Sequence, residues 1–384
     1  VLCVPDANAT TGPYTGYGIC NRMLRVFLCF LADRQHVHMK HGASPSGAGE
    51  QGKVDLQGRW LRRGWRALAA AALLALVACG EPVVPPLTVG MNPWVGYDPM
   101  VLARDRGLTD AKQLRVVELA SASETLRHLR NGLLDAATLT LDETLRLVES
   151  GVAVRIVAVL DESTGGDAVL AAPRITSPAQ LKDEFIAVED SAVGALLLQR
   201  MLTKAGLTRA DVKVTNIEVA RHLEALQSGQ AAAAVTYEPL AGAIEAAGFR
   251  RIFDSRELPG EVLDVLVVRA DVLERRPEAV DALLRGWYAG LDLFKSDLPG
   301  AAESLAPGTD LTPAAYQAVL GGLALHSREA SARELTGNPP PLVEKAAIVA
   351  DALQSIGLLQ RTPRWQELID GTPMQRLQAA GRAP

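Results

Sequence analysis

The chain has 384 residues, of which 48% are hydrophobic and 22% charged, a balance typical of a globular protein with two or three domains. This composition excludes a collagen-like chain, an intrinsically disordered chain and a polytopic membrane protein. The formal net charge of −5 gives no basic surplus of the kind that predicts a nucleic-acid partner. The four cysteines, at positions 3, 20, 29 and 79, lack metal-ligand or CxxC spacing, so we expect no metal and no cofactor.

An apolar run near residue 70 indicates a targeting segment. Four arginines, at positions 59, 62, 63 and 66, precede the run 67–78, which ends in a small residue. This arrangement is typical of a secretory signal peptide, which we place at 59–78. The run is too short for a membrane anchor, which needs about 20 apolar residues.

The end of this run, Leu76-Val77-Ala78-Cys79, is similar to a bacterial lipobox. The resemblance implies that Cys79 receives a lipid and becomes the mature N-terminus, with residues 79–86 as a tether. Residues 1–58 lack helical or strand periodicity, so we expect a non-native or disordered extension, with the true start nearer Met39 or Val54. The first 79 residues carry nine basic and four acidic residues, which leaves 30 basic and 40 acidic in the mature chain.

Strand-like and helix-like segments alternate from residue 87 onward. This order predicts βαβ units and a mainly parallel sheet. The expected strands are 87–91, 114–119, 135–140, 154–160, 168–172, 185–188, 212–217, 232–236, 251–253 and 262–269. The expected helices are 99–106, 124–131, 142–150, 193–205, 221–227 and 240–247, and the chain is helical beyond residue 271, with helices at 278–293, 313–325 and 342–356. Several of these helices end at a glycine, as C-termini often do.

Six short motifs, taken in order, resemble substrate-binding proteins of ABC importers in the nitrate/sulfonate/taurine family, which includes pyrimidine-precursor binders. The first motif, NPWVGYDP at 92–99, carries the W-x-G-Y-x-P pattern of that family. The others are Ser121-Ala-Ser123, Gly132-x-x-Asp135-Ala-Ala137, Val188-Glu189-x-Ser191-x-x-Gly194, Tyr237-Glu238-Pro239 and Pro259-Gly260-Glu261. The resemblance covers about 87–370.

The fold that this resemblance implies is α/β, a type II periplasmic binding protein. It has two α/β lobes joined by a hinge, and a C-terminal helical part packed on the first lobe. Residues 87–165 and 265–384 would form the first lobe and residues 166–264 the second. We place the crossovers near 161–172 and 258–265, where glycines could give hinge flexibility.

The expected ligand site lies in loops at the carboxyl ends of strands, where open α/β sheets bind ligands. Trp94 and Tyr97 could cover a flat or cationic ligand. Ser123 could be a helix N-cap, Asp142 an N-cap or first-turn acid, and Glu238 the start of a helix, as alternatives to a role in binding. The full candidate set is Asn92, Trp94, Tyr97, Ser121, Ser123, Thr140, Asp142, Glu189, Ser191, Tyr237, Glu238 and Asp264.

The charge of these loops bears on the solute. Asp142, Glu189, Asp190, Glu238 and Asp264 are acidic, whereas the matched motifs hold no Arg or Lys. Acidic loops with two aromatic residues fit a small amine-bearing or heteroaromatic solute, such as an aminopyrimidine, better than a nitrate or sulfonate. The nitrate/sulfonate class stays open, because helix N-termini and serines can also bind anions.

The sequence predicts a binding protein rather than an enzyme. It contains no GxSxG, P-loop or HExxH motif. The expected partners are a small solute, an ABC permease with its ATPase subunits, and a membrane reached through the lipid on Cys79. We expect an exported, lipid-anchored monomer on the periplasmic or outer face of a bacterial membrane. The alternatives are a pyrimidine-precursor synthase-like enzyme on the same fold, and a sensory or structural lipoprotein.

Overall fold

The computed structural model describes residues 84–189 and 191–380, which fall within the compact unit Val83–Pro384. The expected signal peptide at 59–78, the lipid site Cys79, the extension 1–58 and Asp190 lie outside the described residues. The expected tether, 79–86, is described only from Val84 onward. Within the described ranges, no helix combines the length and the hydropathy that crossing a membrane requires.

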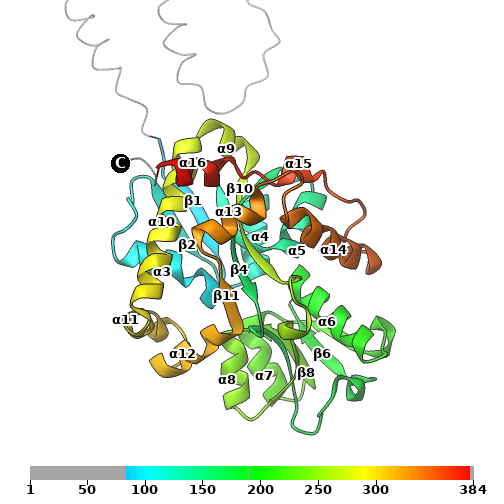
Figure 1. The fold of residues 1–384 in the computed structure, drawn as a ribbon. Coiled ribbons are helices and arrows are strands. Elements are labelled where there is room, and N and C mark those ends of the chain that lie inside the picture. The colour runs from blue at the N-terminus through cyan, green and yellow to red at the C-terminus, as the bar shows by residue number, and fades with distance from the viewer. Residues whose placement is uncertain (1–83, 190, 381–384) are drawn as a thin grey trace, which may run out of the picture. The chain divides into compact units, whose positions relative to one another are not determined.

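A six-stranded sheet organises the first lobe (Figure 1). Its strand order is β11-β4-β10-β3-β1-β2. In this order the strands span Leu323–Leu325, Val154–Ser163, Leu263–Arg269, Ala136–Thr140, Leu87–Met91 and Leu114–Glu118. β1 pairs in parallel with β2 and β3, whereas β10 runs antiparallel to both β3 and β4. β4 and β10 are buried almost throughout because helices cover both faces of this sheet.

A five-stranded sheet organises the second lobe, in the order β7-β6-β8-β5-β9. These strands span Lys213–Asn216, Phe185–Val188, Ala233–Tyr237, Asp167–Ala171 and Arg250–Asp254. Alternation along β5 sends Val169 into a core beneath α6 (Ala192–Lys204) and Leu170 into a core beneath α7 (His222–Gln227) and α8 (Leu240–Ala246). β8 begins with Ala233 and Ala234, which face the two cores and let helices approach both faces of the strand closely.

The chain passes from the first sheet to the second at 164–166 and returns at 255–262. Both links lie within a few residues of the expected crossovers. Hydrogen bonds tie the links together. The Ser163 and Ser255 hydroxyls lie 2.8 Å apart, and the Gly165 amide donates to Ser255 Oγ at 2.7 Å.

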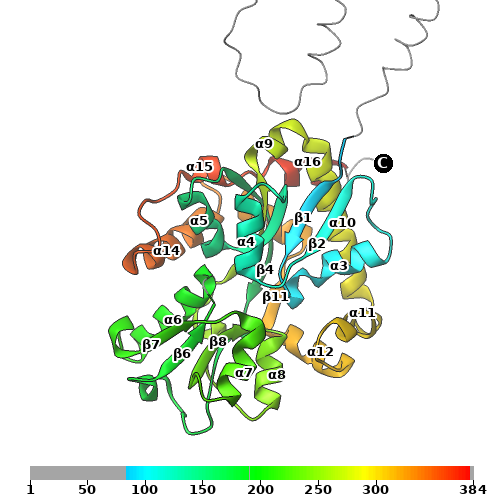
Figure 2. The same cartoon turned by 180° about the vertical axis from the view of Figure 1, so that it is seen from behind.

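The remaining helices pack on the first lobe (Figures 1 and 2). They are α3 (Asp98–Asp105), α4 (Ala122–Arg130), α5 (Leu141–Glu149), α9 (Ala270–Arg275), α10 (Pro277–Ser296), α11 (Leu298–Leu305), α12 (Pro313–Val319), α13 (Arg328–Leu335), α14 (Leu342–Ser355), α15 (Trp365–Leu368) and α16 (Thr372–Ala380). α10 packs directly on α3, where a Cβ on Gly290 would lie 1.9 Å from the Pro99 carbonyl oxygen. The expected C-terminal helical part on the first lobe is thus confirmed.

Two expectations need correction. The sheets are mixed rather than mainly parallel, because β10 and β5 enter each sheet antiparallel to their neighbours after the chain crosses between lobes. The helix expected at 313–325 ends at Val319, and β11 follows as an antiparallel partner of β4. Thr164 and Gly166 both donate to the Gly322 carbonyl, so this segment is also attached to the first crossover.

Candidate functional site

A small buried cavity lies where the two lobes meet. Its walls come from the loop after β1, the start of α5, the start of β10, and the facing ends of β5 and β8. The cavity has a volume of about 20 Å³, which is room for about one water molecule. The lobes are therefore closed on each other. Among the described residues the lining is Asn92, Trp94, Tyr97, Ala122, Thr140, Glu143, Asp167, Val193, Tyr237 and Asp264, with no Lys or Arg.

Aromatic rings form one wall of this cavity. Trp94 and Tyr237 come from opposite lobes and meet edge to face, with ring centroids 6.2 Å apart at an interplanar angle of 81°. The Trp94 indole N–H donates to Asp161 at 3.3 Å, which fixes the ring. A Cβ on Gly96 would lie 2.2 Å from Trp94 Nε1 and 2.5 Å from Asp161 Oδ2, so glycine is needed for this close approach.

Two buried aspartates face each other behind the aromatic wall. Asp264 on β10 is the register partner of Asp161 on β4, and both side chains are almost fully buried. The Tyr97 hydroxyl donates to Asp264 Oδ1. Burial raises the pKa of Asp161 to about 7. Burial, with the charge of Asp161 adding to it, raises the pKa of Asp264 well above its usual range. The pair therefore holds at least one proton near neutral pH.

The start of α5 contributes further carboxyl groups. Thr140 is the N-cap and forms a capping box with Glu143, whose side chain also lines the cavity. One Glu143 carboxylate oxygen accepts from the Thr140 amide at 3.1 Å, and the other is buried with no partner among the described residues. Burial, together with the charge of Asp142, raises the pKa of Glu143 to about 8. Both Asp142 oxygens are also buried without a hydrogen bond, and burial raises the pKa of that group to about 6.

The second lobe supplies Asp167 and Glu189. Asp167 begins β5 opposite Tyr237, and burial raises its pKa to about 7. Glu189 Oε1 accepts from the Ser123 amide at 2.9 Å and from its hydroxyl at 2.7 Å, across the boundary between lobes. Glu189 Oε2 is buried without a described partner. Asn92 reaches the Tyr237 hydroxyl at 3.5 Å, which gives a second polar contact between the lobes.

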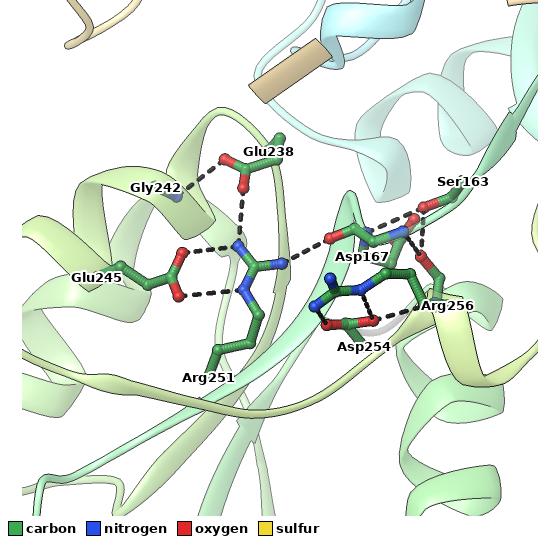
Figure 3. A network of polar contacts seen from close by, with 10 residues as sticks. Ser163, Asp167, Glu238, Gly242, Glu245, Arg251, Asp254 and Arg256 are labelled. Carbon is green, nitrogen blue, oxygen red and sulfur yellow. Dashed lines mark hydrogen bonds and ion pairs between the residues drawn. The ribbon is translucent and has the colours of Figure 1, made fainter. Parts of the chain in front are cut away.

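Glu238 belongs to a separate network beside the crossover (Figure 3). Its carboxylate accepts from the Arg251 guanidinium at 2.9 Å and from the Gly242 amide at 2.8 Å. Arg251 also bonds Glu245 and, at 2.5 Å, the Gly165 carbonyl. These contacts anchor the start of α8 and the first crossover, and Glu238 does not line the cavity. Arg251 therefore already balances the charge of the Glu238 carboxylate.

The structure thus sorts the twelve candidate residues into three groups. The first group lines the cavity: Asn92, Trp94, Tyr97, Thr140, Tyr237 and Asp264. Glu189 and Ser191 border it, in a neighbouring space with Asp167 and Tyr237, and Ser123 bonds Glu189. Ser121, Asp142 and Glu238 do not line it.

The structure also settles the local alternatives. Ser121, not Ser123, is the N-cap of α4 and accepts from the Glu124 amide, so the N-cap alternative for Ser123 is wrong. Asp142 lies in the first turn of α5 and is not its N-cap. Glu238 precedes α8, and Pro239 is the N-cap of that helix.

Three buried acids of this region were not predicted from the sequence: Glu143 and Asp167, which line the cavity, and Asp161, which lies behind Trp94. Asp167 is the single charge of β5, and Asp161 follows the apolar run Ile156–Leu160 of β4, directly before Glu162. A lone carboxylate in such a stretch needs a partner or a ligand, so this signal was present in the sequence. Glu143 gave no such signal, because an acidic residue is common in the first turn of a helix.

The arrangement can recognise hydrogen-bond donors and positive charge. Buried acids surround the cavity from both lobes, and those that line or border it make no ion pair in the described part of the chain. A flat group between Trp94 and Tyr237 could place N–H groups toward Asp264, Asp167 and Glu143. Within residues 84–189 and 191–380, no group of three His, Cys, Asp or Glu side chains is arranged to hold a metal ion.

A family model and several solved structures are similar to this chain. The model of the NMT1-like family matches residues 80–306. No curated protein sequence matches the chain. Among solved structures, the alkanesulfonate-binding protein SsuA from Xanthomonas axonopodis pv. citri, bound to MOPS, is similar with a TM-score of 0.63 and 18% identity. That match covers 77% of this chain and 99% of SsuA.

Two further solved structures show the same likeness. The periplasmic nitrate-binding protein NrtA from Synechocystis PCC 6803 has a TM-score of 0.64 and 12% identity, over 79% of this chain and 91% of NrtA. The desulfurization enzyme DSZB has a TM-score of 0.58 and 16% identity, over 77% of this chain and all of that chain (100%). At these identities the likeness concerns the fold, and it confirms the expected periplasmic binding protein fold.

Proposed function

The chain belongs to the NMT1-like family, and we propose that it is a solute-binding protein that captures a small molecule between its two lobes and delivers it to an ABC importer. The match to this family agrees with the resemblance drawn from the sequence motifs. Solved structures of the same fold include proteins named for binding alkanesulfonate and nitrate, which supports a solute-binding role.

The observation that carries the proposal is the acidic cavity between the lobes. Glu143, Asp167 and Asp264 line it, Asp161 lies behind Trp94, and Glu189 borders it. Burying unpaired carboxylates is costly, and their raised pKa values express that cost. A core built only for stability would favour apolar residues at such positions. A ligand that donates protons or carries positive charge would offset the cost.

This chemistry favours an amine-bearing or heteroaromatic solute. Trp94 and Tyr237 offer aromatic faces and edges for a flat ring, and the carboxyl groups accept from ring or amine N–H groups. A nitrate or sulfonate is the second candidate, favoured by the names of two similar structures. Binding such an anion would need several of these carboxyl groups to be neutral and to donate.

The proposed mechanism is closure of the lobes around the solute. The crossovers at 164–166 and 255–262 would act as the hinge. Ser123–Glu189 and Asn92–Tyr237 would be the contacts that close the cleft. Ligand that interacts with both lobes would favour the closed form, and the permease would select that form.

The remaining parts of the proposal rest on the sequence. Lipid on Cys79 would hold an exported monomer at the membrane, where the permease and its ATPase subunits lie. We propose binding without chemical conversion of the solute. The likeness to the desulfurization enzyme DSZB makes an enzyme on this fold the alternative. Mass spectrometry of the solute after incubation with the protein distinguishes the two, because a binding protein returns it unchanged.

A thermal-shift panel tests the solute class. Amines, aminopyrimidines, nitrate and alkanesulfonates are added at matched concentrations to the purified protein. A ligand present at 100 times its Kd stabilises the folded state by about 2.7 kcal/mol. We expect stabilisation by amines or aminopyrimidines. Stabilisation by nitrate or a sulfonate alone would contradict the amine proposal, and no shift with any class would contradict solute binding of this kind.

A further inference from the structure

A second, much larger hollow adjoins the cavity. This groove has a volume of about 780 Å³, within the range of small-molecule binding sites. One wall comes from α6 and the β6–β7 edge of the second lobe, and the other from α5 and the end of α14 in the first lobe. Polar side chains line the groove together with a set of large apolar ones, namely Val188, Leu198, Leu207, Val214, Ile356 and Leu358.

Arg146 is a positively charged side chain of this groove that makes no ion pair or hydrogen bond within the described residues. Arg146, in the last turn of α5, is partly buried and lines the groove. No hydrogen bond or ion pair of its guanidinium is found within the described ranges. Asp142, one turn earlier, interacts with Arg146 only through its electrostatic field. The other guanidinium of the groove, on Arg209, donates to the Val212 carbonyl at 3.2 Å.

The groove and the cavity meet at Glu189 and Ser191. Both residues line the groove and also the small space that contains Asp167 and Tyr237. Asp167 and Tyr237 in turn line the cavity. The groove and the cavity are therefore neighbouring hollows. Three carboxyl groups line the cavity, Glu189 lies where the hollows meet, and Arg146 lines the groove.

We infer that the groove binds the distal part of the same solute, an apolar segment that ends in a carboxylate, sulfonate or phosphate placed beside Arg146. The inner end of that solute is the amine-bearing group proposed above, so this inference rests on the proposed function. A guanidinium pairs well with each of these anionic groups because its N–H donors match two oxygens at once. The ligand class is accordingly a zwitterion with separated charges.

Calorimetric titration with three matched probes tests the inference. 4-(Aminomethyl)benzoate carries both charges, benzylamine carries only the amine, and benzoate only the acid. A second pair, 6-aminohexanoate and hexylamine, varies the spacing. We expect each zwitterion to bind the wild-type protein at least tenfold more tightly than its amine, and benzoate to bind weakly or not at all.

Variants of Arg146 separate its charge from its structural role. Arg146→Gln should weaken the zwitterions about tenfold and change benzylamine affinity less than twofold. Arg146→Lys should restore part of the difference, and Arg130→Gln, an exposed position on α4, should change nothing. Unfolding midpoints of all three variants show that the fold is intact.

The outcomes distinguish the two claims. Amines that bind as tightly as zwitterions would overturn the groove inference and leave the proposed amine site standing. Equal loss of amine and zwitterion affinity in Arg146→Gln would also overturn it, since the residue would then act on the fold or the cavity. Failure of every amine and zwitterion to bind would contradict both the proposed solute class and the groove inference.

Discussion

Replacing Asp167 with asparagine should stabilise the protein and weaken its binding of amines. Asp167 lies in the cavity wall at the start of β5, with 6% of its surface exposed. Its amide donates to Ser163 Oγ, and that bond survives the substitution because it uses the backbone. Asn keeps the shape of the side chain and cannot ionise. The variant therefore isolates the effect of the charge.

The magnitude follows from the pKa of Asp167. Burial raises that pKa from 3.8 to about 7, and the carboxyl groups of Asp142, Asp161 and Glu238 add to the rise. At 1.36 kcal/mol per pKa unit, ionised Asp167 costs the folded state about 4 kcal/mol. The raised pKa means that this group's contribution to stability is complete below pH 3.8 and is lost as the pH rises to about 7. Between pH 5 and pH 8 the loss is about 2–3 kcal/mol.

Urea unfolding of the ligand-free protein at pH 5 and pH 8 measures this effect. The free-energy difference between Asp167→Asn and wild type should favour the variant by about 2–3 kcal/mol more at pH 8 than at pH 5. The affinity for benzylamine at pH 8 should fall at least tenfold in the same variant. If the variant is more stable but binds benzylamine more weakly, the Asp167 carboxylate contributes to ligand binding at a cost in folding stability.

Asp254→Asn provides the matched control. Burial acts to raise the pKa of Asp254, but hydrogen bonds from Arg256 outweigh it and hold the pKa below 3.8. Its stabilisation is therefore present above pH 3.8, and Asp254→Asn should destabilise the protein equally at pH 5 and pH 8. An Asp167→Asn variant that behaves like this control, with a pH-independent loss of stability, would refute the reasoning.

Three further predictions concern packing, closure and protonation. Gly290→Ala should destabilise the protein by about 1–3 kcal/mol in urea unfolding, because its Cβ would strike the Pro99 carbonyl, whereas Gly308→Ala should have little effect. Ser123→Ala removes the 2.7 Å bond to Glu189 and should enlarge the radius of gyration of the protein measured by X-ray scattering. Benzylamine affinity should fall from pH 8 to pH 5, because Asp167 gains a proton near pH 7; constant affinity would contradict this.

Local patterns predicted most of the fold. β1 and β6 span the residues expected for them, and Gly132 and Gly151 follow α4 and α5 with φ of 71° and 90°, as helix-ending glycines do. β11 was missed because Leu323–Leu325 continues an apolar helical pattern, and only its pairing with β4 makes it a strand. β10 and β5 run antiparallel to their neighbours because the chain crosses twice between the lobes. The hydrophobic periodicity of the sequence does not predict these crossings.

The sequence predicted those site residues that lie close together in a single loop. Trp94 and Tyr97 share one loop and both reach the cavity. Asp264 was among the candidate residues from the sequence, but Asp161 becomes its neighbour only through antiparallel register between strands far apart in the sequence. Glu238 was a candidate site residue that does not line the cavity, because Arg251, on a later strand, forms an ion pair with it. Partners supplied by distant segments decide which acids remain unpaired.

Calorimetric titration of the wild-type protein with benzylamine, 4-aminopyrimidine, nitrate and ethanesulfonate at pH 7.5 tests the central claim most directly. That claim is that the acidic cavity between the lobes binds a solute through its positive charge and N–H donors. We predict saturable binding of at least one of the two nitrogen compounds, and weakening of that binding at least tenfold in Asp167→Asn. Binding of nitrate or ethanesulfonate with no binding of either nitrogen compound would contradict the claim.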